Sequence, residues 1–220
     1  MRFLWRTLLV APLFLASLAN ANTYEDLITA AKMGDTRELA ALVERGAFVN
    51  STDRYGKTLL MLAAQEGHAD TVAFLIKHRA NLNARNADGD TALRLAALHG
   101  RLAVVEKLLA AGANVNMPSW TPLIYAAMNG HQAIVQELLL AGAEVNAAAE
   151  NGFTALIAAA MGGHKAIVGL LLERKADLNM KTDRGLTALD WAHQQKNSEI
   201  AELLIKAGAK SGKSVTIEVR

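Results

Sequence analysis

The stretch that decides the fold is residues 121–146, which read TPLIYAAMNGHQAIVQELLLAGAEVN. Thr121 precedes an apolar run, so its hydroxyl can accept hydrogen bonds from the free amides at the start of a helix. Gly130 can end that helix, because only glycine enters the left-handed conformation without strain. From Ile134 onward, apolar residues recur at i, i+1, i+4 and i+5 up to Gly142, which is a helical pattern. The stretch therefore predicts two short antiparallel helices.

The same pattern recurs along the chain as an internal repeat. Three residue types mark it, each with separations of 33, 33, 30 and 33 residues. They are the asparagines Asn50, Asn83, Asn116, Asn146 and Asn179, the threonines Thr58, Thr91, Thr121, Thr154 and Thr187, and the glycines Gly34, Gly67, Gly100, Gly130 and Gly163. One helix pair cannot bury its apolar face alone, so the units are expected to stack into a solenoid.

Several short motifs resemble the consensus of the ankyrin-repeat family. They are Asp53-Arg54-Tyr55-Gly56-Lys57-Thr58, Leu62-Ala63-Ala64, Thr121-Pro122-Leu123, Gly130-His131 and Ala143-Glu144-Val145-Asn146. The resemblance covers about residues 24 to 210. It implies an all-α ankyrin solenoid of stacked helix-turn-helix units, each preceded by a short β-hairpin finger.

The repeat divides the chain into four parts. A leader occupies residues 1–21, an N-terminal capping helix pair residues 22–50, and a C-terminal tail residues 211–220. Between them we expect five repeats, at 51–83, 84–116, 117–146, 147–179 and 180–210.

The leader has the features of a signal peptide. Arg2 and Arg6 precede an apolar run from residue 7 to residue 18, and Ala19-Asn20-Ala21 has the small-x-small pattern of a cleavage site. A membrane-spanning helix needs about 20 apolar residues, and this run is shorter. We therefore expect export, to a bacterial periplasm in preference to eukaryotic secretion, and no membrane span in the mature chain.

Charge and cysteine content narrow the function classes. The chain has 23 Lys and Arg against 21 Asp and Glu, and the leader contains Arg2 and Arg6 but no acid, which leaves 21 against 21 after cleavage. A neutral chain lacks the basic surface that nucleic acid requires, so no nucleic-acid partner is expected. The chain has no Cys, so it cannot mispair or lose a thiol to oxidation in an exported location.

Two departures from the family pattern stand out. The third unit lacks three residues between Asn116 and Thr121, so its finger is short and should leave a notch beside Trp120. The notch is either a functional feature or a harmless deletion in an exposed turn. The family also often has His three residues after the repeat Thr, where this chain has Met61, Arg94, Ile124, Ile157 and Asp190. More apolar packing between the units is expected in its place.

No pattern predicts catalysis, a metal or a cofactor. His68, His131 and His164 are in register, but neighbouring units would set them about 10 Å apart, whereas the ligands of one zinc ion lie about 2 Å from it. Serine or cysteine nucleophile motifs and phosphate loops are absent. The enzyme alternative is a hydrolase with an unrecognised site among His99, Asp88, Asp90 and His193.

The resemblance implies a protein-binding concave face made by the fingertips and the inner helices. The candidate contact residues are Tyr55, Leu98, His99, Trp120, Met128, Asn129, Phe153, Met161, Leu186 and His193. The apolar members Leu98, Trp120, Met128, Phe153, Met161 and Leu186 would form a stripe, and large exposed apolar patches mark interaction sites. The alternative is that these side chains pack on neighbouring fingers within the stack.

The expected partner is a protein, and the chain is expected to be monomeric without it. By resemblance to exported bacterial ankyrin proteins, one hypothesis is an adaptor or protective partner of a periplasmic protein, such as the antioxidant enzyme catalase. A second is an immunity protein that blocks an exported toxin. A further possibility is that Val215, Ile217 and Val219 in the tail pair with the edge of a partner's sheet.

Overall fold

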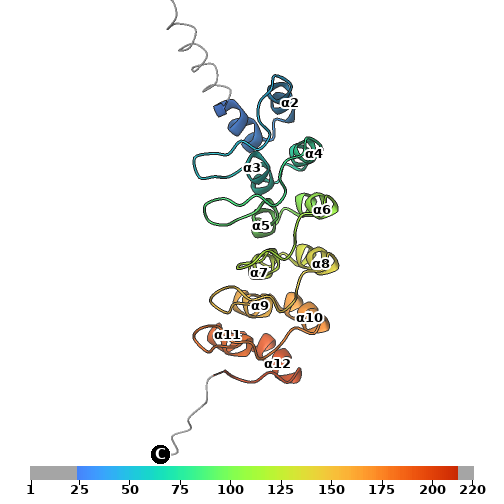
Figure 1. Ribbon diagram of the computed structural model, residues 1–220. Coiled ribbons are helices and arrows are strands. Elements are labelled where there is room, and N and C mark those ends of the chain that lie inside the picture. Colours follow the sequence, from blue (N-terminus) through green and yellow to red (C-terminus); the bar gives the residue numbers. More distant parts are fainter. Residues whose placement is uncertain (1–23, 213–220) are drawn as a thin grey trace, which may run out of the picture.

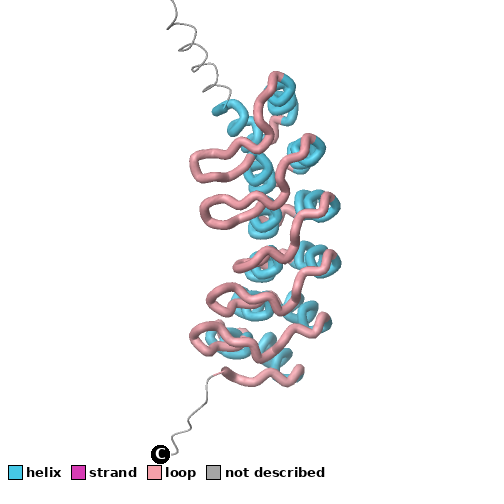
Figure 2. The backbone as a smooth tube through the Cα atoms, viewed as in Figure 1, coloured by secondary structure: helices cyan, strands magenta, loops and turns pink. Residues whose placement is uncertain are grey.

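The computed structural model describes residues 24–212, where paired helices stack in a single row (Figures 1 and 2). The predicted signal peptide and residues 213–220 of the tail lie outside the described residues. The first helices of the pairs form an inner row beside the fingers, and the second helices form an outer row. The inner row comprises residues 24–33, α3 (Leu59–Glu66), α5 (Ala92–Leu98), α7 (Pro122–Met128), α9 (Ala155–Gly162) and α11 (Ala188–Gln194). The outer row comprises α2 (Thr36–Glu44), α4 (Ala69–Lys77), α6 (Leu102–Ala110), α8 (Gln132–Leu140), α10 (Lys165–Glu173) and α12 (Ser198–Lys206).

The repeat threonines begin the inner helices, as the sequence predicts. Each has an extended backbone, and its hydroxyl accepts a hydrogen bond from the amide three residues later; Thr121 and Ile124 are an example, at 3.3 Å. The same cap occurs in all five units that contain a repeat threonine. All five are also buried, so the cap satisfies an amide that water cannot reach.

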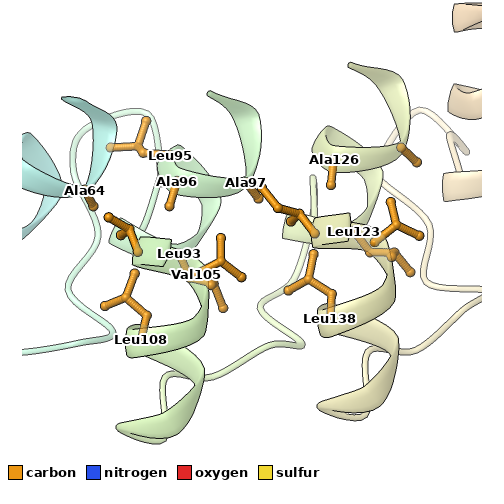
Figure 3. Close-up of a cluster of buried hydrophobic side chains, with 14 of the residues drawn as sticks. Ala64, Leu93, Leu95, Ala96, Ala97, Val105, Leu108, Leu123, Ala126 and Leu138 are labelled. Atoms are coloured by element: carbon orange, nitrogen blue, oxygen red, sulfur yellow. The ribbon is translucent and has the colours of Figure 1, made fainter. Parts of the chain in front are cut away.

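Small residues make the inner row a continuous core. In α9, residues 155–160 are all buried, because α7 packs on one side of this helix and α11 on the other. Outer helices are buried along one face only, as at Leu108 and Leu138. In Figure 3 Leu108 lies beside Leu93 and Leu138 beside Leu123, and Ala96, Ala97 and Ala126 of the inner helices belong to the same buried cluster. The alternation of alanine and leucine lets the two rows approach closely. The predicted all-α solenoid is confirmed.

A ladder of ring-to-carbonyl hydrogen bonds joins successive units. His164, which precedes α10, donates from Nε2 to the carbonyl of Met128 in the preceding unit, at 2.9 Å. His68 and His131 donate in the same way to carbonyls of the units that precede them. Arg101 takes this position in the second repeat and donates to the carbonyl of Gln65. These histidines therefore connect units, which accounts for their register without a metal.

The glycine series is explained by the same contacts. A Cβ at Gly130 would lie 2.6 Å from the His164 ring, so the next unit occupies the space of a side chain. At the corresponding position of the last described unit stands Lys196, which also has a positive φ, 56°, but no further unit packs beside it within residues 24–212. Lysine is tolerated there although its backbone is left-handed. Close approach of the next unit, in addition to conformation, is therefore what requires glycine in the earlier units.

The asparagine series forms a second ladder on the opposite side of each helix pair. The side-chain oxygen of Asn83 accepts a hydrogen bond from the amide of Asn114 in the next unit, at 2.9 Å. The side-chain oxygens of four further residues accept equivalent hydrogen bonds from backbone amides: Asn50, Asn116, Asn146 and Asn179. Each repeat asparagine thus satisfies a loop amide of its neighbour, and this explains why the residue recurs with the period of the stack.

The fingers are tight hairpin turns with very little β-structure. In the first finger the amide of Asp53 donates to the carbonyl of Lys57, at 2.8 Å, and Thr52 forms a β-bridge with Thr58. This is the one isolated bridge among residues 24–212, so the expected β-hairpins are shorter than two-stranded ribbons. The second, fourth and fifth fingers have the same closing bond at Asn86, Ala149 and Thr182, and the third loop does not.

Candidate functional site

The middle of the solenoid carries apolar side chains on the face formed by the fingers and the last turns of the inner helices, which we call the inner face. Seven residues after the repeat Thr, the three central units have Leu98, Met128 and Met161, all partly exposed. The first and fifth units have Gln65 and Gln194 at this position. The apolar segment is therefore confined to the centre of the face and bordered by amide side chains.

The next residue along each inner helix adds exposed polar groups. His99 and Asn129 are exposed, and Glu66 lies at the corresponding position of the first repeat. Burial and the positive charge of Arg101 lower the pKa of His99 below its usual 6.5, while Glu66 opposes the shift. His99 is therefore mainly neutral at neutral pH and can both donate and accept a hydrogen bond.

Four aromatic rings form a continuous row across units three to five, which we call the aromatic row. The rings of Trp120 and Tyr125 are 5.5 Å apart, those of Trp120 and Phe153 are 5.6 Å apart and stacked, and those of Phe153 and Trp191 are 5.7 Å apart. Separations of this size are favourable for ring pairs. Trp120 and Phe153 also pack on a small buried cluster that includes Ala158. The row is thus partly a structural element and partly an exposed surface.

A buried guanidinium borders this row. Arg94 is 4% exposed, its Nε lies 3.5 Å from Asp90 Oδ1, and its Nη1 donates to the carbonyl of Gly89. The same guanidinium lies over the ring of Tyr125, 5.6 Å from its centroid. The other units have Met61, Ile124, Ile157 and Asp190 at this position, so the second repeat places a buried positive charge where the first, third and fourth have an apolar residue.

The structure brings most of the predicted contact residues onto one face, with one correction. Leu186 is only 4% exposed, because the closed turn of the fifth finger holds it against the stack, so it does not belong to the apolar stripe. His193 occupies the position of the second alanine of the other inner helices, where Ala160 is fully buried, and it is exposed at the end of the stack. Tyr55, 57% exposed, lies on the first finger, away from the aromatic row.

Sequence reasoning missed Tyr125, Trp191 and Arg94. The signal was present in the repeat: Tyr125 and Trp191 both stand four residues after the repeat Thr, where Leu62, Leu95 and Ala158 stand in the other units. The small side chain of Ala158 belongs to the cluster on which Trp120 and Phe153 pack. The alternation of large and small residues at one repeat position therefore marks the aromatic row.

The catalytic alternative gains no geometric support. His99 lies beside α5 and His193 lies in α11, with α7 and α9 between these helices in the stack (Figure 1). Asp90 is paired with Arg94. No group of three or more His, Asp or Glu residues that could hold a metal ion occurs within residues 24–212. No helix in that range is long and apolar enough to span a membrane.

The last unit has a separate polar centre, which holds the start of the tail. The Asp190 carboxylate accepts hydrogen bonds from the amides of Thr187 and Gly212, both at 2.8 Å, and from the hydroxyls of Thr187 and Ser211. Burial would raise the pKa of Asp190, but the hydrogen bonds from Ser211, Thr187 and Gly212 outweigh it and hold the pKa below its usual value. Asp190 thus fastens residues 211–212 to the end of the solenoid.

We expect Asp190→Asn to lower the free energy of unfolding at neutral pH by about 2 kcal/mol, because several donors lose a charged acceptor. The folded pKa lies below the unfolded value, near 3.8, so the stabilisation is complete above the unfolded pKa and is lost as the pH falls through the folded pKa. Urea unfolding of both chains at neutral pH and in a series that extends well below pH 3.8 measures this. A stability difference that stays constant in acid would contradict the assignment.

These features define a helical repeat protein of the class that binds other proteins through an extended face. A family model of ankyrin repeats matches residues 27–119, 83–149 and 123–214. The chain therefore belongs to the ankyrin-repeat family, whose fold is typically a non-catalytic protein-interaction module.

Solved structures of similar chains agree. The human ASB11 ankyrin repeat domain is 28% identical, with a TM-score of 0.78 and coverage of 84% of each chain. An ankyrin repeat domain from Acinetobacter baumannii is 32% identical, with a TM-score of 0.75 and coverage of 84% of this chain and 98% of that one. A chain in the complex of a predatory endopeptidase from Bdellovibrio bacteriovorus with an immunity protein is 35% identical, with a TM-score of 0.75 and coverage of 82% and 97%. No curated protein sequence matches significantly.

Proposed function

We propose that this chain is an exported, non-catalytic binding module that holds one protein partner on its inner face. The observation that carries the proposal is the confined apolar segment of Leu98, Met128 and Met161, which lies beside the partly exposed aromatic row. Apolar and aromatic anchors with a polar border are typical of protein interfaces. Export is part of the proposal because of the signal-peptide pattern in residues 1–21.

Of the two roles expected from the sequence, adaptor of a periplasmic protein and immunity protein against an exported toxin, the second is favoured. The similar chain from Bdellovibrio bacteriovorus comes from a complex between an endopeptidase and an immunity protein, and the likeness extends over 97% of that chain. We therefore propose that the partner is an exported hydrolase of the peptidase type, which this chain blocks before it reaches its own cell's substrates. No feature of residues 24–212 specifically favours a catalase or another antioxidant enzyme as the partner.

A double substitution on the inner face tests the proposal. Met128→Glu with Met161→Glu should weaken capture of an exported endopeptidase from the same genome by at least about 100-fold, because buried charges at the centre of an interface lack partners. Both side chains are partly exposed, but Met128 also packs on the buried cluster of Ile124, Ala149 and Ala158, so the unfolding midpoint should fall somewhat while the chain remains folded at the temperature of the assay. Surface plasmon resonance with purified endopeptidases measures the affinity, and circular dichroism measures the folding.

A matched control lies on the outer row. Leu140 in α8 and Ile205 in α12 are 71% and 54% exposed, so Leu140→Glu with Ile205→Glu introduces the same two charges on exposed apolar side chains away from the inner face. This variant should capture the endopeptidase as well as the original chain does. Equal loss of capture in the control and in the inner-face variant would show that the inner face is not the binding surface.

A further inference from the structure

The fingers form two stacked pairs separated by a gap. In the first pair, a Cβ on Gly56 would lie 3.5 Å from the amide nitrogen of Ala87 in the second finger. In the second pair, the amide of Asp183 in the fifth finger donates to the carbonyl of Asn151 in the fourth, at 3.0 Å. Figure 2 shows the short third loop between these pairs. We call the space that a full third finger would occupy the finger slot.

The width of the slot follows from the repeat. Asn83 and Thr91 are separated by seven residues, as are Asn146 and Thr154, whereas Asn116 and Thr121 are separated by only four. The three missing residues correspond to the tip of a hairpin turn. One fingertip is therefore absent, while the units on either side continue the stack with the usual helix contacts.

Backbone groups on both sides of the slot lack the bond that joins the fourth and fifth fingers. The carbonyl of Asp88 corresponds to that of Asn151, and the amide of Glu150 corresponds to that of Asp183. Neither Asp88 nor Glu150 makes this backbone hydrogen bond to another finger within residues 24–212. A hairpin turn placed in the slot could accept from the amide of Glu150 and donate to the carbonyl of Asp88, as in the bond between the fourth and fifth fingers; the stacked first and second fingers do not make this bond.

The floor of the slot combines aromatic surface with a buried donor. Trp120, which precedes the third inner helix, is partly exposed and touches the Tyr125 ring. Arg94 directs its guanidinium over Tyr125, and its buried Nε has no hydrogen-bond acceptor, only the ion pair with Asp90 at 3.5 Å. A buried donor without an acceptor is costly, and a charged one more so. An occupant of the slot does not reach the buried Nε, but the positive charge of Arg94 favours an occupant with a carboxylate or carbonyl oxygen on this side.

The backbone beside the floor is held in a strained form. Ser119 has φ of +75°, at the position where the other four fingers have glycine. A serine in the left-handed region costs about 1 kcal/mol or more relative to glycine. The strained turn keeps Trp120 in the slot in place of a full fingertip. Among residues 24–212, Arg79, Lys175 and Lys196 also have a positive φ without being glycine, but Ser119 is the one such residue that lies in a finger.

We infer that the finger slot receives one tight hairpin loop of the protein partner, with a carboxylate or carbonyl oxygen at its tip directed toward Arg94. The loop takes the place of the missing fingertip, stacks between the second and fourth fingers, and covers the exposed part of Trp120. The inference rests on the proposed function, since it names which part of the partner enters the inner face. It also explains why the third finger is short while the rest of its unit follows the repeat.

A variant that fills the slot tests the inference. Insertion of Asn-Ala-Asp after Pro118 together with Ser119→Gly gives the third unit a fingertip like that of the second. As a control, the same three residues are inserted after Arg184 in the fifth finger, which leaves the slot open. The probe is a displayed library of disulfide-closed loops, selected on the full chain with an open slot and read out by binding and by tryptophan fluorescence.

Selected loops should contain an Asp, Asn or Glu at a tight turn and should bind the original chain and the control equally. Their affinity for the filled variant should be lower by at least about 30-fold, which is the effect of one interface anchor. The filled variant should be folded and at least as stable as the original chain. Loops that bind the filled variant equally well would overturn the inference, as would a selection that yields no binder.

The outcome for the inference is separable from that for the proposed function. An endopeptidase captured equally by the open and the filled chain would overturn the slot and leave the proposed function standing. Failure of every endopeptidase to bind either chain, with slot-dependent loop binding retained, would count against the proposed partner and not against the slot.

Discussion

Gly130→Ala is expected to lower the free energy of unfolding by about 3 kcal/mol. This value adds three costs: an alanine in the left-handed conformation, steric overlap with the next unit, and the loss of a hydrogen bond. The φ of Gly130 is +77°, and a Cβ there would lie 2.6 Å from the His164 ring. The ring would have to move, and its hydrogen bond to the carbonyl of Met128 would be lost. Chemical denaturation measures the change.

Gly142 provides a matched control. Its φ is +86°, but no atom lies within 4 Å of the space a Cβ would fill. Gly142→Ala should therefore cost only the conformational part, about 1 kcal/mol. A double-mutant cycle with His164→Ala sharpens the comparison, because removal of the ring should reduce the effect of Gly130→Ala to that of the control. Equal effects at the two glycines would disprove the role of the inter-unit contact.

Trp120→Ala should lower the free energy of unfolding by about 3 kcal/mol, near the lower end of the range for large aromatic side chains. Trp120 stacks on Phe153 and touches Tyr125, and it packs on the buried cluster of Ile124, Ala149 and Ala158. The sequence alone predicts that replacing Trp120 and Phe153 weakens capture without affecting helicity. The structure changes this expectation, since the unfolding midpoint should fall as well. Thermal denaturation followed by circular dichroism measures it.

Tyr55 is the control for an aromatic residue on the same face. It is 57% exposed, and its aromatic contact is with Arg54, whose guanidinium carbon lies 4.9 Å from the ring centroid. Tyr55→Ala should change the free energy of unfolding by less than about 0.5 kcal/mol. If Trp120→Ala were equally mild, the aromatic row would be a surface feature without a structural role.

The sequence by itself determined the fold, because the features that repeat with the period of the stack are the ones that build it. Thr121 and its equivalents cap helices, which is a local interaction between residues three apart. The repeat asparagines and glycines were recognised from spacing alone. Their partners in the next unit became visible only in the structure, as at Asn83 with Asn114 and at Gly130 with His164.

Much of the candidate surface was also predictable. Leu98, Met128 and Met161 lie where the family resemblance places them, because one repeat position keeps one orientation through the stack. The approach failed at Leu186, which belongs to the last unit and is buried. In that unit the backbone of Gly212 lies beside Gly185 in place of a further finger, so the environment of the inner units does not transfer to Leu186.

What only the tertiary structure decided concerns contacts that do not repeat. The aromatic row from Tyr125 to Trp191 and the buried Arg94 depend on which large and small side chains meet between particular units, and no periodic pattern specifies that. The sequence showed that three residues are missing before Thr121, and the structure showed what borders the gap. Period and local capping follow from the order of residues, whereas the binding features depend on side chains brought together by stacking.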